Sequence, residues 1–177
     1  KPIKTTFNWG AFQYGLDPSQ KEVQNHLQNL GKTVGQDWGF DFLKIDFLYA
    51  SSPLHANYKS SYSSRAQMIY QGVKDIREGL GKDKTLLGCG APLGPCVGLV
   101  DVMRIGCDTA ANWAIFENFT RKNLDLVIPA LKPALIATMQ RSYMHNTLWI
   151  NDPDCVVVRK NRSKLNMEEI KTQLTIF

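Results

Sequence analysis

The sequence predicts an α/β fold, specifically an incomplete (β/α)8 TIM barrel of about five parallel strands with outer helices. Short apolar segments alternate with stretches whose apolar residues recur every three or four positions, as in parallel sheets covered by helices. Polar residues follow the apolar segments, and in a barrel those strand ends meet at one mouth. A complete barrel takes about 250 residues, whereas this chain has 177. An open doubly wound sheet fits the same alternation, but it would spread the polar strand ends along an edge.

The first expected elements are one strand and one helix. Residues 1–10 read as irregular, and Ala11–Leu16 reads as a short buried strand. Ser19 and Glu22 have the spacing of a capping box, which predicts the start of a helix. Apolar residues then recur at steps of three and four as far as Trp38, so this helix has one apolar face.

A second strand and a second helix follow. An almost entirely buried strand is expected within Gly39–Ala50, and a Ser-rich loop comes after it. Ser64 and Gln67 offer a second capping box, and the apolar face of the helix they start reaches Leu80. Gly81 is expected to end this helix.

The second half of the chain is expected to hold three strands and two helices. The strands are expected within Lys84–Gly90, Gly98–Gly106 and Thr147–Val158. The helices are expected within Leu124–Met144 and from Asn166 to the end of the chain. Because Pro129 and Pro133 disfavour a helix interior, the first of these helices should start late or kink.

Composition excludes several classes of function. The formal charge is +5, but the 21 basic residues are scattered and no nucleic-acid-binding motif accompanies them. No apolar run reaches the roughly 18 residues of a membrane span, and no signal peptide is visible. Four cysteines without CxxC spacing and only three histidines predict no metal site. We expect reduced thiols, a cytoplasmic location and no cofactor, and the first residue, Lys1, suggests a processed or partial product.

Lys44 and Asp46 form the first candidate constellation. Two residues apart in a strand, they point to the same face, near the end that is catalytic in a barrel. The lysine would lower the pKa of the carboxylate and keep it ionised, as a carboxylate nucleophile requires. The competing interpretation is a structural salt bridge inside the barrel or at a solvated edge, although a desolvated pair gains little stability.

Arg104 and Asp108 form the second constellation. Arg104 ends a strand and Asp108 overhangs the mouth, where shielding by Trp113 would suit a proton donor. The competing interpretation is that Asp108 caps the next turn, a common role for aspartate. A nucleophile and an acid/base carboxylate about 5–5.5 Å apart define a retaining glycosidase.

Two further motifs are weaker. The stretch LGCGAPLGPCVG matches neither a Walker motif nor GxGxxG, so we interpret it as a sharply turned loop. It would place Cys89 at the mouth, unless Cys89 is a buried packing residue. In WINDPDC, Asp152 and Asp154 are residues of a type that binds metal ions. Without other clustered oxygen ligands, an Asx turn or a role in supporting the site residues fits better.

Together these segments resemble glycoside hydrolase family 36, the melibiase-type α-galactosidases. The resemblance rests on WGFDFLKIDFLYA, LLGCGAPLGPCVGLVDVMRIGCDTA and LWINDPDC, in the family's order. It implies that Asp46 is the nucleophile and Asp108 the acid/base. Lys44, Cys89 and Arg104 match positions that contact galactosyl hydroxyls. The implied reaction is hydrolysis of terminal non-reducing α-galactosides, including oligosaccharides, with retention and without a cofactor.

The chain also departs from that family. Cys107 stands where the family commonly has proline, which could loosen Asp108. We expect residues 1–177 to form a single partial catalytic barrel domain that lacks the family's N-terminal β-sandwich, first barrel strands, last strand and C-terminal β-domain. The polypeptide alone is therefore expected to be poorly active or inactive, with the missing segments on the parent chain or supplied in an oligomer.

Three alternatives share these residues. A transglycosylase similar to raffinose synthase differs in whether sugar or water attacks the intermediate. An α-N-acetylgalactosaminidase differs in the pocket around the 2-substituent. A non-catalytic remnant of the barrel is the alternative from a different class. Nucleic acid and membrane partners are not expected.

Overall fold

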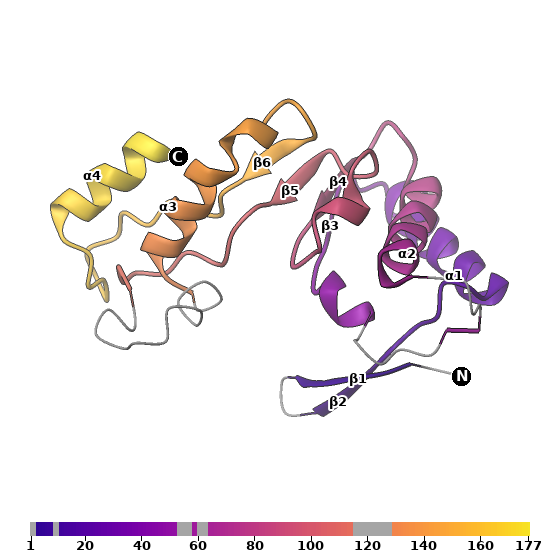
Figure 1. The fold of residues 1–177 in the computed structure, drawn as a ribbon. Coiled ribbons are helices and arrows are strands. Elements are labelled where there is room, and N and C mark those ends of the chain that lie inside the picture. The colour runs from indigo at the N-terminus through magenta and orange to yellow at the C-terminus, as the bar shows by residue number, and fades with distance from the viewer. Residues whose placement is uncertain (1–2, 9–10, 53–57, 60–63, 115–128) are drawn as a thin grey trace. The chain divides into compact units, whose positions relative to one another are not determined.

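The computed structural model describes residues 3–8, 11–52, 58–59, 64–114 and 129–177. The chain divides into two compact units, Lys1–Met103 and Arg104–Phe177. Figure 1 gives the labels of the elements. No helix in the described ranges is long and apolar enough to cross a lipid bilayer.

The first unit opens with an antiparallel hairpin of β1 (Ile3–Asn8) and β2 (Ala11–Gly15). The prediction that residues 1–10 are irregular was therefore wrong. Ala11–Leu16, the expected first strand of the parallel sheet, contributes to this hairpin instead. In the hairpin, Ile3 pairs with Gly15 and Asn8 with Ala11. Apolar residues occur both in the strands of a hairpin and in the strands of a parallel sheet. Composition alone therefore did not show which partner Ala11–Gly15 has.

The three strands that follow the hairpin belong to a parallel sheet. These strands, β3 (Phe42–Ile45), β4 (Thr85–Gly88) and β5 (Val102–Arg104), pair in parallel in the order β3-β4-β5. The register places Ile45 opposite Gly88. With β6 next to β5, the sheet has four strands in the described residues, which confirms the predicted α/β fold.

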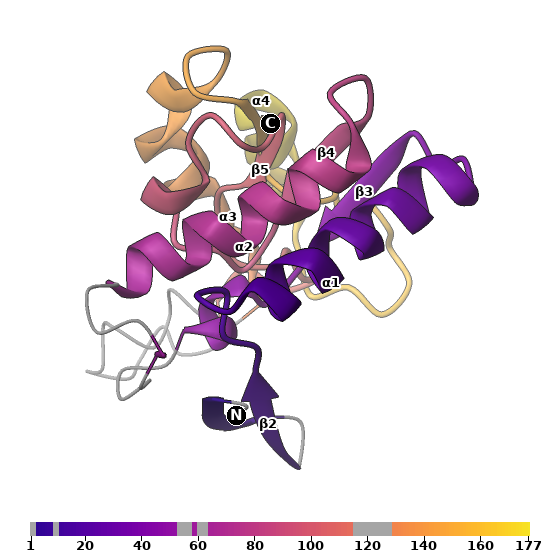
Figure 2. The same ribbon diagram turned by 90° about the vertical axis from the view of Figure 1, so that its right-hand side faces the viewer.

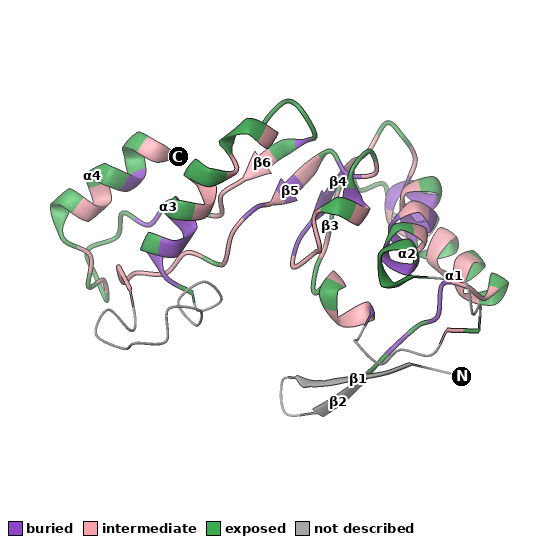
Figure 3. Ribbon diagram, viewed as in Figure 1, coloured by how far each residue is buried: buried purple, intermediate pink, exposed green. Residues whose placement is uncertain are grey.

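Two helices pack side by side in the first unit (Figure 2). They are α1 (Lys21–Lys32), continued by a π-helical segment Thr33–Asp37, and α2 (Arg65–Leu80). Glycine permits their close approach, because a Cβ on Gly31 would lie only 2.7 Å from the Leu80 backbone nitrogen. Buried residues gather on α2 and in β4 (Figure 3), so the core of this unit lies between that helix and the sheet.

The two predicted capping boxes had different outcomes. Ser64 Oγ accepts from the Gln67 N–H at 3.2 Å and Gln67 Oε1 accepts from the Ser64 N–H at 2.7 Å, which confirms the cap of α2. The cap predicted for α1 was wrong, since that helix has Gln20 at its N-cap. The hydroxyl of Ser19 donates instead to Oδ1 of the buried Asp17 at 2.7 Å.

The second unit contains the end of β5, β6 (Ile150–Asp152), α3 (Leu131–Gln140) and α4 (Met167–Ile176). The Ile105 N–H donates to the Asp152 carbonyl oxygen at 3.1 Å, so β6 lies beside the end of β5. Helix α3 begins after Pro129 and holds Pro133 in its first turn, which confirms the predicted late start. The portion of that predicted helix before Pro129 lies outside the described residues.

Candidate active site

The end of β3 brings Lys44 and Asp46 together, as the alternation of strand side chains predicted. Lys44 Nζ lies 3.4 Å from Asp46 Oδ2, and their side chains are 42% and 36% exposed. An ion pair this exposed stabilises a fold by only about 0–1 kcal/mol. The structural interpretation of the pair therefore has little energetic support, because the fold gains little by keeping it.

Asp46 is held by the backbone that follows it. Its Oδ1 accepts from the Phe47 N–H at 2.7 Å. Phe47 itself has a φ of 55° in the left-handed region, which costs a non-glycine residue about 1–2 kcal/mol. Backbone strain of this kind concentrates at functional sites, where the surrounding structure fixes it.

Cys89 is the second support of Asp46, and the sheet register places it there. Because Ile45 lies opposite Gly88, the next residues of the two strands, Asp46 and Cys89, are neighbours as well. The Cys89 thiol forms a hydrogen bond with the Asp46 carboxylate, and Cys89 is only 5% exposed. Both interpretations of Cys89 thus hold in part: it is buried, and it contacts a candidate catalytic group.

The electrostatic environment keeps Asp46 ionised. Partial burial raises the pKa of Asp46, but the hydrogen bonds from the Phe47 N–H and the Cys89 thiol oppose it. The positive charge of Lys44 acts in the same direction, and together these groups lower the pKa of Asp46 below its ordinary value. The sequence indicated the contribution of Lys44. It gave no signal for the Phe47 N–H, whose position depends on the local backbone turn.

Arg104 organises the candidate site of the second unit. Its side chain is 10% exposed and binds three carboxylates, each through a different nitrogen. Nη1 lies 3.1 Å from Asp108 Oδ1, Nε 2.9 Å from Asp152 Oδ2, and Nη2 3.0 Å from Asp154 Oδ1. The predicted proximity of Arg104 and Asp108 is confirmed, and the two other acids join them.

The surroundings of Asp108 differ from those expected. Its side chain is 68% exposed, so the predicted shielding of Asp108 by Trp113 was wrong. The carboxylate of Asp108 is thus open to a reacting group.

The Asx-turn interpretation of WINDPDC is confirmed. The Asp154 N–H donates to Asp152 Oδ1 at 2.9 Å, and Asp154 adopts a positive φ of 79°. The described ranges hold no group of three or more His, Cys, Asp or Glu side chains arranged to bind a metal ion. The three acids around Arg104 form ion pairs with its guanidinium group.

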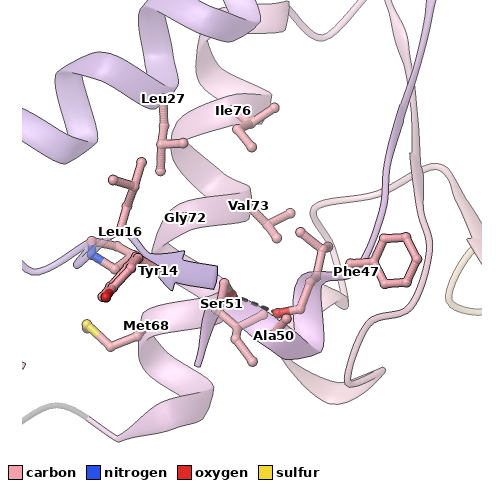
Figure 4. Close-up of a pocket in the computed structure, with 14 residues that line it drawn as sticks. Tyr14, Leu16, Leu27, Phe47, Ala50, Ser51, Met68, Gly72, Val73 and Ile76 are labelled. Atoms are coloured by element: carbon pink, nitrogen blue, oxygen red, sulfur yellow. Dashed lines mark hydrogen bonds between the residues drawn. The ribbon is translucent and has the colours of Figure 1, made fainter. Parts of the chain in front are cut away.

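A separate pocket of the first unit lies between β2, α1, α2 and the 3-10 turn Leu48–Ser51, with a cavity volume of about 280 Å³ (Figure 4). Apolar side chains such as Leu27, Met68 and Val73 line it. Ser51 Oγ donates to the Leu48 carbonyl oxygen at 2.7 Å, so its hydroxyl is already used within the turn. The lining includes neither Lys44 nor Asp46, and the pocket therefore lacks the chemistry of the candidate site.

Comparisons with known proteins point to one kind of fold. No protein-family model matches the chain. The structure of the Thermus thermophilus α-galactosidase TtGalA with p-nitrophenyl α-D-galactopyranoside is similar at 32% identity and a TM-score of 0.78, covering 98% of this chain and 34% of that one. The structure of TtGalA with stachyose is similar at 32% identity and a TM-score of 0.79, covering 99% of this chain and 36% of that one.

The fold and the polar strand ends define a class, an α/β protein built as part of a (β/α)8 barrel. More particularly, the chain has an α-galactosidase-like fold over nearly its whole length. It spans about a third of the length of the enzyme it matches.

Proposed function

We propose that the protein carrying this sequence is a retaining α-galactosidase with Asp46 as its nucleophile and Asp108 as its acid/base. The observation that carries the proposal is the carboxylate of Asp46 at the carboxyl end of β3, kept ionised by the Phe47 N–H, the Cys89 thiol and Lys44. A carboxylate in that state at that end of a barrel strand suits attack on a sugar carbon. Similarity to TtGalA supports a galactoside as the substrate.

The first step forms a covalent intermediate. One oxygen of Asp46 attacks C1 of the galactosyl unit, and the bond between C1 and the glycosidic oxygen breaks. Asp108 transfers its proton to that departing oxygen, which becomes a hydroxyl group of the leaving sugar or alcohol. Asp108 must therefore enter this step protonated, while Asp46 must enter it ionised.

The second step releases galactose. Asp108, now a carboxylate, accepts a proton from water as the water oxygen bonds to C1, and the ester bond to Asp46 breaks. Two displacements at C1 return the α configuration. The two carboxylates and water complete the reaction, and the required separation of about 5–5.5 Å between the carboxyl groups stays a prediction.

Three further side chains are proposed to bind the sugar. Lys44 and Arg104 offer charged N–H donors to galactosyl hydroxyls, and Cys89 offers a thiol beside the nucleophile. Because Lys44 and Cys89 also contact Asp46, they would hold the sugar and the attacking oxygen in one arrangement. The proposed substrate class is terminal α-galactosides, including oligosaccharides.

The test uses the protein that carries this sequence and p-nitrophenyl α-D-galactopyranoside. We expect hydrolysis with an α-galactose product by NMR, and a loss of about 10⁴-fold or more in kcat for Asp46→Ala, the scale of nucleophile removals. Asp41→Ala is the control, because Asp41 precedes the same strand and pairs with Lys84 at the surface.

A trapping experiment identifies the nucleophile directly. A fluorinated galactosyl reagent should add its mass to the peptide that contains Asp46, and to no peptide of the Asp46→Ala variant. Unchanged activity after Asp46→Ala, or a label on another residue, would overturn the assignment. Transfer of galactose to a sugar acceptor in place of water would instead favour a transglycosylase.

A further inference from the structure

Asp154 binds two neighbours of Asp108, the arginine that pairs with it and the residue that follows it. Its Oδ1 lies 3.0 Å from Arg104 Nη2, and the same guanidinium binds the Asp108 carboxylate through Nη1. Its Oδ2 accepts from the N–H of Thr109, the residue after Asp108, at 2.7 Å. One carboxylate therefore fixes the cation that binds the Asp108 side chain and the backbone that follows it.

Asp152 fixes Asp154 in turn. Asp152 Oδ1 accepts from the Asp154 N–H at 2.9 Å, while Asp152 Oδ2 accepts from Arg104 Nε at 2.9 Å. Both oxygens of each of these acids are thus engaged. Charged hydrogen bonds of this number and geometry define a single arrangement better than one ion pair does.

Exposure separates the three acids by role. Asp152 and Asp154 have side chains that are 20% and 16% exposed, whereas Asp108 is 68% exposed. The first two acids therefore form the support, and Asp108 is the acid that a substrate can reach. Asp152 and Asp154 hold the guanidinium group that binds the Asp108 carboxylate, and through it they position Asp108.

We propose that Asp154 is a positioning residue for Asp108, acting through Arg104 and Thr109. This inference rests on the proposed role of Asp108 as acid/base. A general acid works only within hydrogen-bond reach of the oxygen it protonates, so a support that removes freedom from its loop maintains catalysis. Cys107, directly before Asp108, does not restrict the backbone as a proline would, which places this task on Asp154.

The test variant is Asp154→Asn, which keeps the shape of the side chain. Its amide has only one oxygen, so the NH2 group must face either the Arg104 or the Thr109 donor. The matched control is Asp101→Asn, since Asp101 also binds an arginine, Arg77, and accepts a backbone N–H, from Leu86 at 2.8 Å. Both variants are made in the protein that carries this sequence.

The kinetic readout compares two leaving groups. Melibiose needs its departing sugar oxygen protonated, whereas p-nitrophenolate leaves readily without a proton. For Asp154→Asn we expect kcat/KM on melibiose to fall by about 10- to 100-fold, within the range of general acid catalysis, and on p-nitrophenyl α-galactoside to fall far less. Asp101→Asn should lower the two values equally if it lowers them at all.

Hydrogen exchange supplies a readout that is independent of activity. The Thr109 amide should exchange faster in Asp154→Asn than in the unchanged protein, and at the same rate in Asp101→Asn. Unchanged exchange at Thr109, or equal losses on the two substrates, would overturn the positioning role. If the unchanged protein hydrolyses neither substrate, the proposed function fails. Faster exchange would then still support the anchoring of the Asp108 loop, and unchanged exchange would overturn it.

Discussion

Gly90 lies directly against Asp46. A Cβ built on Gly90 would sit 3.0 Å from Asp46 Oδ1 and 3.0 Å from the Phe47 backbone nitrogen. Gly90 also has a positive φ of 52°, and its carbonyl oxygen accepts from the Tyr49 N–H at 2.8 Å. The loop after β4 therefore needs glycine here for two reasons, its backbone conformation and the space that the carboxylate occupies.

Replacing Gly90 should impair the candidate nucleophile. Gly90→Ala should cost about 1–2 kcal/mol of stability through its left-handed backbone, and it should displace Asp46 from the Phe47 N–H. A misplaced reacting group can cost about 10²-fold in rate, so we expect a loss of that order in kcat on p-nitrophenyl α-galactoside. Thermal unfolding measured beside the kinetics separates the two effects.

Gly94→Ala is the matched control for this prediction. Gly94 belongs to the same loop, but a Cβ there would meet nothing within 4 Å, and its φ is not positive. We expect this variant to keep both its stability and its activity. Equal behaviour of the two variants would show that Gly90 does not control Asp46.

Lys44→Met should change the pH dependence of the reaction. The positive charge of Lys44 is one of the groups that lower the pKa of Asp46, so without it the pKa should rise. Asp46 then protonates at a higher pH, and the acidic limb of the kcat/KM profile should move to higher pH. Loss of the proposed sugar contact should add a decrease of about 10- to 100-fold at neutral pH.

The comparison for Lys44 is Lys84→Met. Lys84 pairs with Asp41 at the surface, and the chain thus offers a second lysine–aspartate pair outside the candidate site. Its removal should leave the acidic limb where it is in the unchanged protein. An acidic limb that stays fixed in Lys44→Met would contradict the electrostatic role given to Lys44.

Local chemistry made part of this structure predictable. The strand with Lys44 and Asp46 was visible because two charges on one face of an apolar segment are rare, and the Ser64 cap was visible because its partner lies three residues away. The prediction that this strand is almost entirely buried was wrong, since its side chains are half-buried or exposed and Phe42 is 52% exposed. Arg104 and Asp108 were likewise close in sequence. In each case the deciding contact joins residues within one element or turn.

Long-range contacts account for what the sequence did not reveal. Ser19 matches the capping pattern, yet the buried Asp17 takes its hydroxyl, and Asp17 also binds the Lys59 N–H from a distant loop. The contacts of Asp154 were also not visible in the sequence, because its partners Arg104 and Thr109 are more than forty positions away. A motif shows which bonds a residue is able to make, and the tertiary structure decides which of them form.

Asp17→Asn should reveal a pH-dependent contribution to stability. Burial raises the pKa of Asp17, but hydrogen bonds from the Ser19 side chain and from the backbone of Lys59 and Ser19 outweigh it, so the pKa is lowered. A carboxyl group with a lowered pKa in the folded state stabilises the fold above its unfolded pKa of about 3.9. That contribution disappears as the pH falls through the folded pKa.

At neutral pH we expect Asp17→Asn to lower the free energy of unfolding by about 1.5–3 kcal/mol, the range for hydrogen bonds to a charged group. Below about pH 4 the difference from the unchanged protein should shrink, because the native carboxyl also becomes protonated. Denaturant titrations from neutral to acidic pH measure this difference. Asp41→Asn should have little effect at any pH, since Asp41 is 86% exposed. A difference that stays constant down to acidic pH would mean that the charge of Asp17 does not contribute, and that only the shape of its side chain matters.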